Sequence, residues 1–456
     1  MTVTVVLFTR DLRVHDNPAL AAAVRRGSEV VPLFVLDDAI ITSGFNAPNR
    51  AAFLAAALVE LDDQLRRRGG QLVLRRGPVP DEVAAVVLHT GATELHIAAD
   101  VSAYSRLRER RLRERLAPAG CAVMVHAGSI TVADPSELTP STGRDHFAVF
   151  TPYFRRWQGI PRRRPIVPPT RIAMPQVDGD PLPKRETICA GVTSQELKVG
   201  GEGSGRELLK RWLAGPVRGY HEASDDLAGD MTSHLSPYLH FGCLSATEIL
   251  SRLDLSDPGA QAFARQLCWR DFHHQVLAAR PDAASADYRT REIRWSTDDQ
   301  VFRAWREGRT GYPVVDAGMR QLLAQGWMPG RARLIAASLL SKTLRIDWRL
   351  GAAHFERWLV DGDVANNRLN WQWAAGTGTD TRPNRVLNPL RQAERFDPLG
   401  DYARRWIPEL GHLEGKRIHQ PWKHGVPRSV YPRPLTVGDV DRQVALDLFS
   451  DNGEIN

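Results

Sequence analysis

The chain has 456 residues, more than one hydrophobic core usually fills, which predicts two or three domains. Its 60 Lys and Arg residues outnumber 53 Asp and Glu residues, and the resulting charge of +7 permits a polyanionic partner without requiring one. The sequence has no run of eighteen apolar residues and no amino-terminal leader with a cleavage site, so we expect a cytoplasmic protein without a membrane span.

Residues 2–127 alternate short β-branched runs with amphipathic segments, a pattern typical of a parallel sheet covered on both faces. The expected strands are TVTVVLFT, VVPLFVL, QLVLRR, ELHIAA and AVMVHA. They predict a Rossmann-like α/β domain with a five-stranded parallel sheet. The first strand continues into FTRDLRVHDNP instead of a GxGxxG turn, so we expect no dinucleotide there.

Residues 130–205 lose this periodicity and are rich in Pro and Arg, which predicts a long extended connector over the surface. Within it, Arg162, Arg163 and Arg164 are expected to form a solvated strap. The glycines of GGEGSGRELLKRW lack the Lys-Ser/Thr of a phosphate loop and are expected to lead flexibly into a helix.

From residue 206 onward, apolar residues recur at helical spacing and predict a nearly all-α domain. All twelve tryptophans lie at or beyond Trp157. The four cysteines are far apart and form no CxxC pair, which argues against a disulfide framework or a structural zinc site. We therefore expect no metal and a reducing compartment.

Residues 346–380 contain carboxylates, amides, glycines and four tryptophans at a density that indicates a site. The segment DGDVANNRLNWQ starts like a calcium loop, but Asn366 stands where the invariant glycine should be and Gln372 where the bidentate glutamate should be. Calcium is not expected.

The motifs FTRDLRVHDNPAL, LCWRDF, RAWREGRTGYPVVDAGMRQL, DGDVANNRLNWQWAAGTGTD and NPLRQAERFDPLGDYARRW stand in fixed order and resemble the DNA photolyase and cryptochrome family. The chain is most similar to bacterial class I cyclobutane pyrimidine dimer photolyases. The resemblance implies an α/β antenna domain at 1–129, a linker at 130–205 and a helical FAD-binding domain at 206–456.

The resemblance also implies a flavin site. The positions matching the family's FAD contacts are Tyr220, Thr232, Ser233, Leu235, Ser236, Arg333, Asp361, Asp363 and Asn367. Taken alone, the segment TSHLSPYLHFG also fits a capped helix with a Pro turn, and Asn367 also fits a turn amide. In photolyases, the asparagine that Asn367 matches faces the flavin ring nitrogen that takes up hydrogen.

Three further matches, Trp305, Trp348 and Trp371, correspond to the tryptophan chain that passes electrons from the surface to photoexcited oxidised flavin. Any one of them also fits a buried core position. For catalysis, the resemblance implies that light-excited reduced FAD gives an electron to a pyrimidine dimer flipped out of UV-damaged DNA. Trp269 and Trp373 match the aromatic walls of the lesion pocket, and Gln266 matches a lesion-reading position.

Several positions depart from the usual dimer-repair pattern. Gln266 replaces a glutamate, Pro329 and Gly330 replace a His-Asn pair, Ser224 replaces an arginine, and Asp271 replaces a glutamate. These departures leave two alternatives to dimer repair, namely a cryptochrome-type photoreceptor that signals through a partner protein and a photolyase with an altered lesion preference. The short tail ending in VALDLFSDNGEIN favours repair over signalling. A plain flavin redox protein is disfavoured because no nicotinamide site is recognisable.

An antenna chromophore is a further expectation. The folate-binding Asn-Glu pair of some relatives corresponds to Tyr104 and Ser105, whereas Asp100 and the residues Asn49, Arg50 and Phe53 resemble relatives that bind 8-hydroxy-deazaflavin. Deazaflavin is therefore favoured over methenyltetrahydrofolate. Asp100 also fits the cap of a helix beginning near Ser102. Relatives act as monomers, and the same state is expected here.

Overall fold

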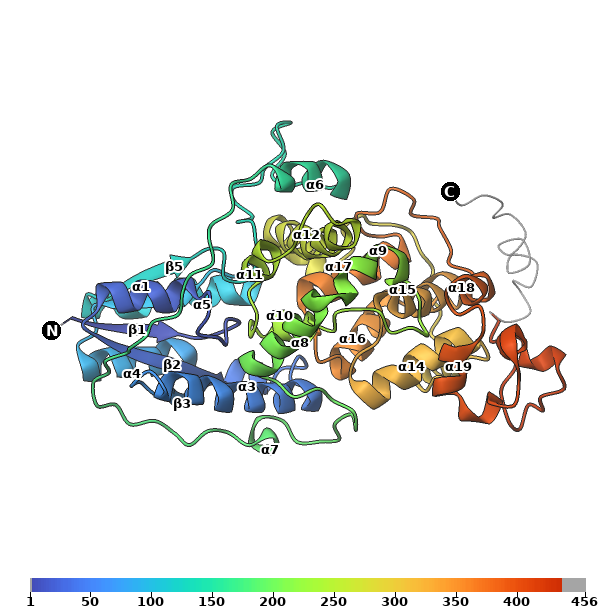
Figure 1. Cartoon of the computed structure of the whole chain (residues 1–456), viewed down its shortest axis with the longest axis horizontal. Helices are drawn as coiled ribbons and strands as arrows, with labels where there is room; N and C mark the ends of the chain where they lie inside the picture. Colours follow the sequence, from blue (N-terminus) through green and yellow to red (C-terminus); the bar gives the residue numbers. More distant parts are fainter. Residues whose placement is uncertain (1, 437–456) are drawn as a thin grey trace.

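The computed structural model describes residues 2–436. The tail considered above falls within residues 437–456 and lies outside the described residues. A sheet with flanking helices occupies one end of the molecule and a larger group of helices occupies the other (Figure 1). This arrangement confirms the predicted combination of an α/β part and an all-α part.

The sheet has five parallel strands in the order β3-β2-β1-β4-β5, which confirms the predicted strand number and direction. The strands are β1 (Val3–Leu7), β2 (Glu29–Asp37), β3 (Val73–Gly77), β4 (Glu94–Ala98) and β5 (Ala122–His126). Helices α1 (Pro18–Arg26) and α3 (Pro48–Arg66) contribute to the core on one face, and α4 (Val79–Thr90) and α5 (Ala103–Leu116) to the core on the other. A short helix, α2 (Asp38–Ile41), follows β2.

The expectation that every strand is buried on both faces is wrong for β5. Because β5 is the last strand of the sheet, it lacks a neighbour on one side, and Ala122 and Met124 are exposed. The inner strands β1 and β2 are almost entirely buried, as their continuous apolar sequence indicated.

The segment that follows β1 joins the two parts of the molecule. Arg13 is fully buried and donates hydrogen bonds to the carbonyl oxygens of Gly242 (2.9 Å) and Ser129 (3.0 Å). Gly242 has a φ of 68°, and a Cβ atom there would lie 1.9 Å from the carbonyl oxygen of Arg10, so only glycine allows this close approach. The FTRDLRVHDNP segment thus serves as an interdomain contact.

Residues 130–201 carry two helices, α6 (Phe150–Gln158) and α7 (Arg185–Ile188). After α6 the segment crosses the α/β part and returns along its edge beside α3, where α7 lies (Figure 1). The expectation of a solvated arginine strap is wrong for Arg163, whereas Arg162 and Arg164 are exposed. Arg163 forms an ion pair with the buried Asp16 and donates to the carbonyl oxygen of Gly128 (2.8 Å). Arg162 lies over the ring of Trp157 at 5.1 Å.

The glycine-rich segment before residue 206 is also more ordered than predicted. Helix α8 (Glu202–Ala214) begins within it, and the buried Glu202 accepts hydrogen bonds from the backbone N–H groups of Val14 (2.8 Å) and His15 (3.1 Å). A Cβ atom at Gly200 would lie 2.1 Å from the carbonyl oxygen of Phe53. The glycine therefore permits close packing against α3.

The remaining elements are helical, as predicted from the 3.6-residue periodicity. They are α9 (Tyr220–Ala223), α10 (Ser236–His240), α11 (Ala246–Ser251), α12 (Pro258–Ala279), α13 (Asp299–Arg306), α14 (Pro313–Gln325), α15 (Gly330–Ser338), a π-helical turn (Leu339–Thr343), α16 (Trp348–Trp358), α17 (Val364–Ala375), α18 (Pro389–Phe396) and α19 (Asp401–Trp406). Short 3-10 turns lie at Ala117–Ala119, Pro216–Gly219, Pro281–Ala284, Pro408–Leu410, Gly415–His419 and Pro421–Lys423.

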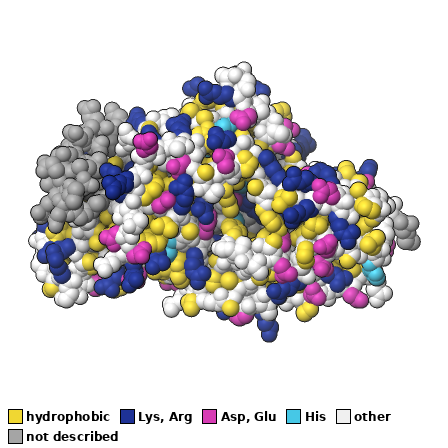
Figure 2. Space-filling model, turned by 180° about the vertical axis from the view of Figure 1, so that it is seen from behind, with side chains coloured by type: hydrophobic (Ala, Val, Ile, Leu, Met, Phe, Trp, Pro, Cys, Tyr) yellow, Lys and Arg dark blue, Asp and Glu magenta, His cyan; other side chains and the backbone are white. Residues whose placement is uncertain are grey.

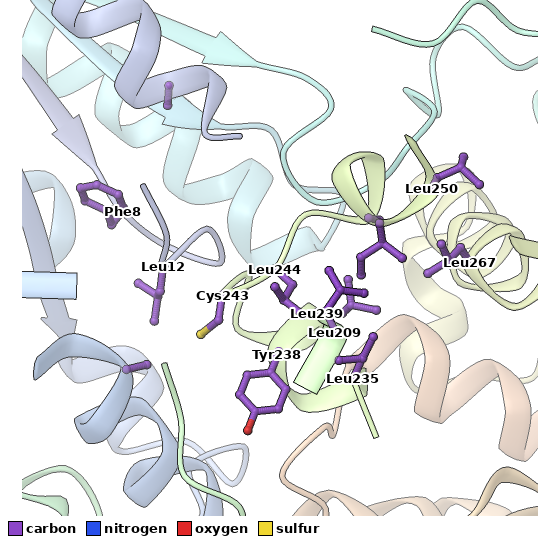
Figure 3. Packing of buried hydrophobic residues seen from close by; sticks show 14 of the residues in the cluster. Phe8, Leu12, Leu209, Leu235, Tyr238, Leu239, Cys243, Leu244, Leu250 and Leu267 are labelled. Atoms are coloured by element: carbon purple, nitrogen blue, oxygen red, sulfur yellow. The ribbon is translucent and has the colours of Figure 1, made fainter. Parts of the chain in front are cut away.

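One hydrophobic cluster extends from the sheet into the helical part. Phe8 and Leu12, near the end of β1, lie on one side of it, and Cys243, Leu244 and Leu267 lie on the other (Figure 3). Because this core is continuous, we expect the two parts to hold a fixed relative position.

Asp271 of α12 anchors the start of the 130–201 segment. Its Oδ2 accepts hydrogen bonds from the backbone N–H groups of Val132 and Ala133 (both 3.0 Å) and from Nε1 of Trp157 (2.9 Å). Burial raises the pKa of this carboxyl from 3.8 to about 6, although the three donors act in the opposite direction. The raised pKa means that the protonated carboxyl stabilises the fold below pH 3.8 and that this contribution is lost as the pH rises through 6.

We therefore expect the stability advantage of the natural protein over Asp271→Asn to shrink with increasing pH, because the asparagine does not ionise. The difference in the free energy of unfolding should fall by about 2–3 kcal/mol between pH 4 and pH 7. Urea unfolding of both proteins across this range measures it. Parallel pH profiles would contradict the assigned titration.

Candidate functional site

A cavity of about 600 Å³ lies in the helical part, bounded by α10, α12, α15, α16 and α17, a volume in the range of cofactor sites. It is lined by all the residues predicted to contact flavin, namely Tyr220, Thr232, Ser233, Leu235, Ser236, Arg333, Asp361, Asp363 and Asn367. Gln266, Trp269, Trp371 and Trp373 line the same cavity. From behind, Lys and Arg side chains are seen gathered beside hydrophobic ones near the middle of the molecule (Figure 2).

One edge of the cavity presents polar atoms that have no hydrogen-bond partner among residues 2–436. The hydroxyl of Thr232 and Nδ1 of His234 are buried without a hydrogen bond within the described residues. His234 has a φ of 51° and lies against the ring of Trp327, 3.9 Å between centroids, while Nε1 of Trp327 donates to Ser236 Oγ (3.2 Å). Burial raises the pKa of the neighbouring Tyr220 to about 12. These groups are available to a polar ligand.

Arg333 and Asp361 form a two-pronged ion pair across the cavity wall. The guanidinium nitrogens donate to Oδ1 (3.1 Å) and Oδ2 (2.9 Å) of Asp361, and Nε donates to the carbonyl oxygen of Met328 (2.9 Å). Parallel hydrogen bonds of this kind fix the plane of the guanidinium. The pair therefore presents a rigid charged surface to the cavity.

Asp363 connects the cavity to the α/β part. Its Oδ1 accepts from the backbone N–H of Asn366 (2.8 Å) and caps α17, while its Oδ2 forms an ion pair with Arg10. Burial disfavours the ionised form, but the guanidinium groups of Arg10 and Arg270 outweigh it and hold the pKa of Asp363 well below its usual range. The carboxylate is thus charged throughout the physiological range.

Three histidines near the cavity are uncharged at neutral pH. Burial lowers the pKa of His273 and His274 to about 4 and that of His240 well below its usual value. Nδ1 of His273 lies within hydrogen-bond distance of Oδ1 of Asn366 (3.0 Å). The positive charge around the cavity therefore comes from arginines.

Trp269 and Trp373, the predicted lesion walls, are each held by a side chain behind them. The ring of Trp269 is stacked on Phe150, with 3.6 Å between centroids and 3° between planes, and Arg265 lies 4.8 Å from the Phe150 ring. Arg385 lies 4.8 Å from the ring of Trp373. These contacts restrict both indoles before any ligand binds.

Three of the five residues that depart from the usual repair pattern line the cavity, whereas Pro329 and Asp271 do not. Gln266 is exposed and Ser224 is half-buried, and both line the cavity with Gly330. A Cβ atom at Gly330 would meet no atom within 4 Å. The position of an added Cβ atom is therefore open space.

Trp305, Trp348 and Trp371 are buried, and Trp371 alone of the three lines the cavity. The rings of Trp305 and Trp371 are 5.8 Å apart at an interplanar angle of 72°. Trp348 begins α16 and donates from Nε1 to Asp287 (2.9 Å). One turn further, a Cβ atom at Gly351 would lie 2.2 Å from the Trp371 ring, so α16 and α17 pack closely.

Sequence reasoning missed Trp295, which is partly exposed. The next residue, Ser296, donates its backbone N–H to Arg345 (2.6 Å) and forms a β-bridge with Ile346, two residues before Trp348. Trp305, Trp348 and Trp371 are all buried, and Trp295 is a partly exposed indole that packs against the same cluster. Its position after an irregular segment gave no sequence signal.

Two cavity residues were also overlooked. Asn370 is exposed to the cavity beside Trp371, and its Nδ2 donates to the carbonyl oxygen of Asn366 (2.7 Å). The helical spacing from Asn366 could have identified it. His234 was overlooked because a positive φ outside glycine is rarely readable from sequence, although His is among the residues enriched there.

The predicted antenna residues have mixed environments. Asp100 does not cap α5, because Ser102 does so, and Asp100 instead pairs with Arg10 at 3.5 Å. Phe53 is stacked on Phe241 in the core, 4.7 Å between centroids. Asn49 donates to Ser194 Oγ (2.9 Å), and Arg50 donates to the backbone of residues 356 and 359, so both are engaged in structural contacts.

Tyr104 and Ser105, which stand at the folate-type positions, lie in the first turn of α5. Tyr104 is exposed, with Arg108 5.7 Å from its ring, and Ser105 is buried. Ser105 accepts a hydrogen bond from Ser102 Oγ (2.8 Å). Neither residue lines the 600 Å³ cavity.

Within residues 2–436, no group of three His, Cys, Asp or Glu side chains is arranged to hold a metal ion. No helix in that part of the chain is long and apolar enough to cross a membrane. The four cysteines are free thiols.

Comparisons with known proteins give consistent results. Residues 4–173 match the family model described as DNA photolyase, and residues 263–451 match that of the FAD binding domain of DNA photolyase. A deoxyribodipyrimidine photo-lyase of Streptomyces griseus is 56% identical over 95% of this chain and 96% of its own length.

Two solved structures have nearly the same fold. A bacterial class III photolyase from Agrobacterium tumefaciens has a TM-score of 0.90 and 32% identity, covering 98% of this chain and 97% of its own. A cryptochrome from Synechocystis has a TM-score of 0.89 and 28% identity, covering 98% and 99%.

Proposed function

The chain belongs to the DNA photolyase family, and on this premise we propose that it is a deoxyribodipyrimidine photo-lyase that repairs UV-damaged DNA in the light. The observation that carries the proposal is a single cavity lined by the residues matched to flavin contact and by two preset indoles. The 56% identity to a photo-lyase over nearly the whole chain favours repair over the signalling alternative.

The residues of the cavity fit FAD. The buried unpaired hydroxyl of Thr232 suits a phosphate oxygen, and Nδ1 of His234 suits a ligand hydroxyl because Nε2 already pairs with Asp230 (2.7 Å). The Arg333–Asp361 pair and Asn367 suit a polar ring edge. When bound, reduced and excited by blue light, FAD supplies an electron that splits the cyclobutane ring and then returns.

The protein's own part is to place the lesion. Trp269, backed by Phe150, and Trp373, backed by Arg385, provide flat apolar faces for an unstacked pyrimidine pair. Gln266 offers an uncharged amide to the base edges. Arginines at the cavity attract the DNA backbone.

We also propose that Trp371, Trp348 and Trp305 form a chain that passes electrons to oxidised flavin. The partly exposed Trp295 is its outermost member. The close packing of α16 on α17 and the 5.8 Å separation of Trp305 and Trp371 support short hops between rings. Indoles are the side chains most readily oxidised, so a continuous set can carry a positive charge outward.

An antenna chromophore is proposed beside Arg10 at the carboxyl ends of the strands. Four buried polar atoms there have no partner within the described residues: Thr9 Oγ1, Asp37 Oδ2, Arg108 Nε and His240 Nδ1. Such orphaned groups favour a polar ring ligand, and the Asp100 match favours 8-hydroxy-deazaflavin over methenyltetrahydrofolate. Mass spectrometry of the released pigments tests this, and release of folate or of FAD alone would contradict it.

The proposal includes a monomer acting in the cytoplasm. Four free thiols agree with a reducing compartment. Light scattering coupled to gel filtration measures the oligomeric state, and a mass near twice 50.8 kDa would contradict the monomer.

A lesion panel tests the repair function and its specificity. Chemically reduced protein is irradiated with oligonucleotides that carry a cyclobutane dimer or a (6-4) photoproduct, with matched samples kept in the dark. We expect light-dependent repair of the dimer alone. Repair of the (6-4) lesion alone would show instead that Gln266 and the open space at Gly330 have changed the substrate.

A further inference from the structure

We propose that Glu356 is a positioning residue that holds the amide of Asn367 with its oxygen toward the cavity and thereby favours reduced over oxidised FAD. This inference rests on the proposed function, because it concerns the same flavin cavity. It assigns a role to a residue that does not itself line the cavity.

The orientation of the Asn367 amide follows from its neighbours. Its Nδ2 donates to the carbonyl oxygen of Ala352 (3.0 Å) and to Oε1 of Glu356 (3.2 Å), both on α16. Carbonyl and carboxylate oxygens only accept, so the reversed amide would place oxygen against oxygen. Because the amide is planar, its own oxygen points away from α16, and no donor meets this oxygen within residues 2–436.

Glu356 is in turn held firmly. Arg368 donates to its Oε1 (2.7 Å) and Oε2 (2.5 Å), and the side chain of Glu356 is only 10% exposed. The backbone carbonyl of Glu356 accepts from the buried Arg50. The carboxylate is therefore held in one position, in which Oε1 accepts hydrogen bonds from both Asn367 and Arg368.

A fixed amide oxygen discriminates between flavin states. The ring nitrogen that takes up hydrogen bears a lone pair in oxidised FAD and an N–H group in reduced FAD. An oxygen facing it accepts from the N–H but repels the lone pair. Locking the amide therefore favours reduced FAD, whereas a free amide could turn and donate to the oxidised ring.

The test is the reduction potential of bound FAD, measured by dye-coupled titration in the dark without DNA. Glu356→Met removes one acceptor from Asn367 and leaves a side chain of similar length. A net hydrogen bond contributes about 1 kcal/mol, so we expect a roughly fivefold to tenfold loss of preference for reduced FAD. For a two-electron couple, this is a fall of about 20–30 mV.

Two further variants separate positioning from general damage. Glu356→Gln retains an oxygen that can accept from Asn367 and Arg368, so it should restore most of the potential. Glu248→Met is the matched control, because Glu248 pairs with Arg206 through two hydrogen bonds (2.8 and 2.9 Å), has an 11% exposed side chain and does not line the cavity. It should leave the potential unchanged.

A double-mutant cycle completes the test. In an Asn367→Leu background, Glu356→Met should cause no further change, because the amide on which it acts is absent. An unchanged potential in Glu356→Met, an equal shift in Glu248→Met, or an undiminished shift in the Asn367→Leu background would overturn the proposal. Should Glu356→Met fail to fold, Glu356→Asp withdraws the carboxylate from Asn367 while keeping its charge, and it should lower the potential in the same direction.

Failure of this proposal is separable from failure of the proposed function. The titration needs only FAD bound in the dark, whereas repair is scored on damaged DNA in the light. A protein that repairs dimers with an unchanged potential in Glu356→Met loses the positioning role alone.

Discussion

Replacing Trp371 by Phe is expected to abolish light-driven reduction of oxidised FAD while leaving dimer repair by chemically reduced protein intact. Of the three tryptophans Trp305, Trp348 and Trp371, only Trp371 lines the cavity, and it lies 5.8 Å from Trp305, so we expect it to take the first step of the charge migration. Phenylalanine is far harder to oxidise. Repair needs an electron from reduced FAD and does not require this path.

The measurement is the absorbance of oxidised flavin during blue illumination with a reductant, set beside repair of a dimer oligonucleotide by protein reduced beforehand. Trp348→Phe and Trp295→Phe should slow photoreduction as well, because they interrupt the proposed route to solvent. Trp406→Phe, in α19 and away from the cavity lining, is the control. Loss of repair together with photoreduction in Trp371→Phe would contradict the assigned role.

Replacing Asp363 by Ala is expected to destabilise the protein by about 3 kcal/mol and to release FAD, because the change removes one of the two carboxylates that pair with the half-buried Arg10 and also removes a helix cap. Asp363 forms the ion pair with Arg10 and accepts from the first turn of α17. Thermal unfolding with and without added FAD, and the flavin-to-protein ratio after gel filtration, measure both effects.

Two comparison variants separate the contributions of Asp363. Asp363→Asn keeps the cap and should cost less, while Asp257→Ala removes the cap of α12 alone and should cost about 1 kcal/mol. If Asp363→Ala retained all of its FAD, the ion pair between Asp363 and Arg10 would not be needed to keep the cavity in its FAD-binding form. A loss no larger than that of Asp257→Ala would show that the ion pair contributes nothing.

Much of the fold was predictable because its cause is local. Apolar β-branched runs define β1, β2 and β4, and the 3.6-residue periodicity defines the longer helices. Predictions failed where tertiary contacts determine the structure. Arg163 resembles a solvated charge until Asp16 is brought beside it, and the glycines before α8 resemble a flexible lead until α3 packs on them.

The candidate site was predictable only in part. Family resemblance identified cavity residues such as Thr232, Arg333 and Asn367, but their proximity depends on how α10, α15 and α17 pack. The stack of Phe150 on Trp269 joins α6 to α12, and no local pattern in either segment indicates it. The position of Glu356 against Asn367 likewise follows from the packing of α16 on α17.

The central claim is that reduced FAD in this cavity transfers an electron to a dimer held at Trp269 and Trp373. The most direct measurement is single-turnover repair, in which a molar excess of reduced, FAD-loaded protein is mixed with a dimer-containing oligonucleotide and the restored thymines are counted after blue illumination. We expect full restoration in the light and none in the dark. An intact dimer after saturating light, despite bound FAD and excess protein, would contradict it.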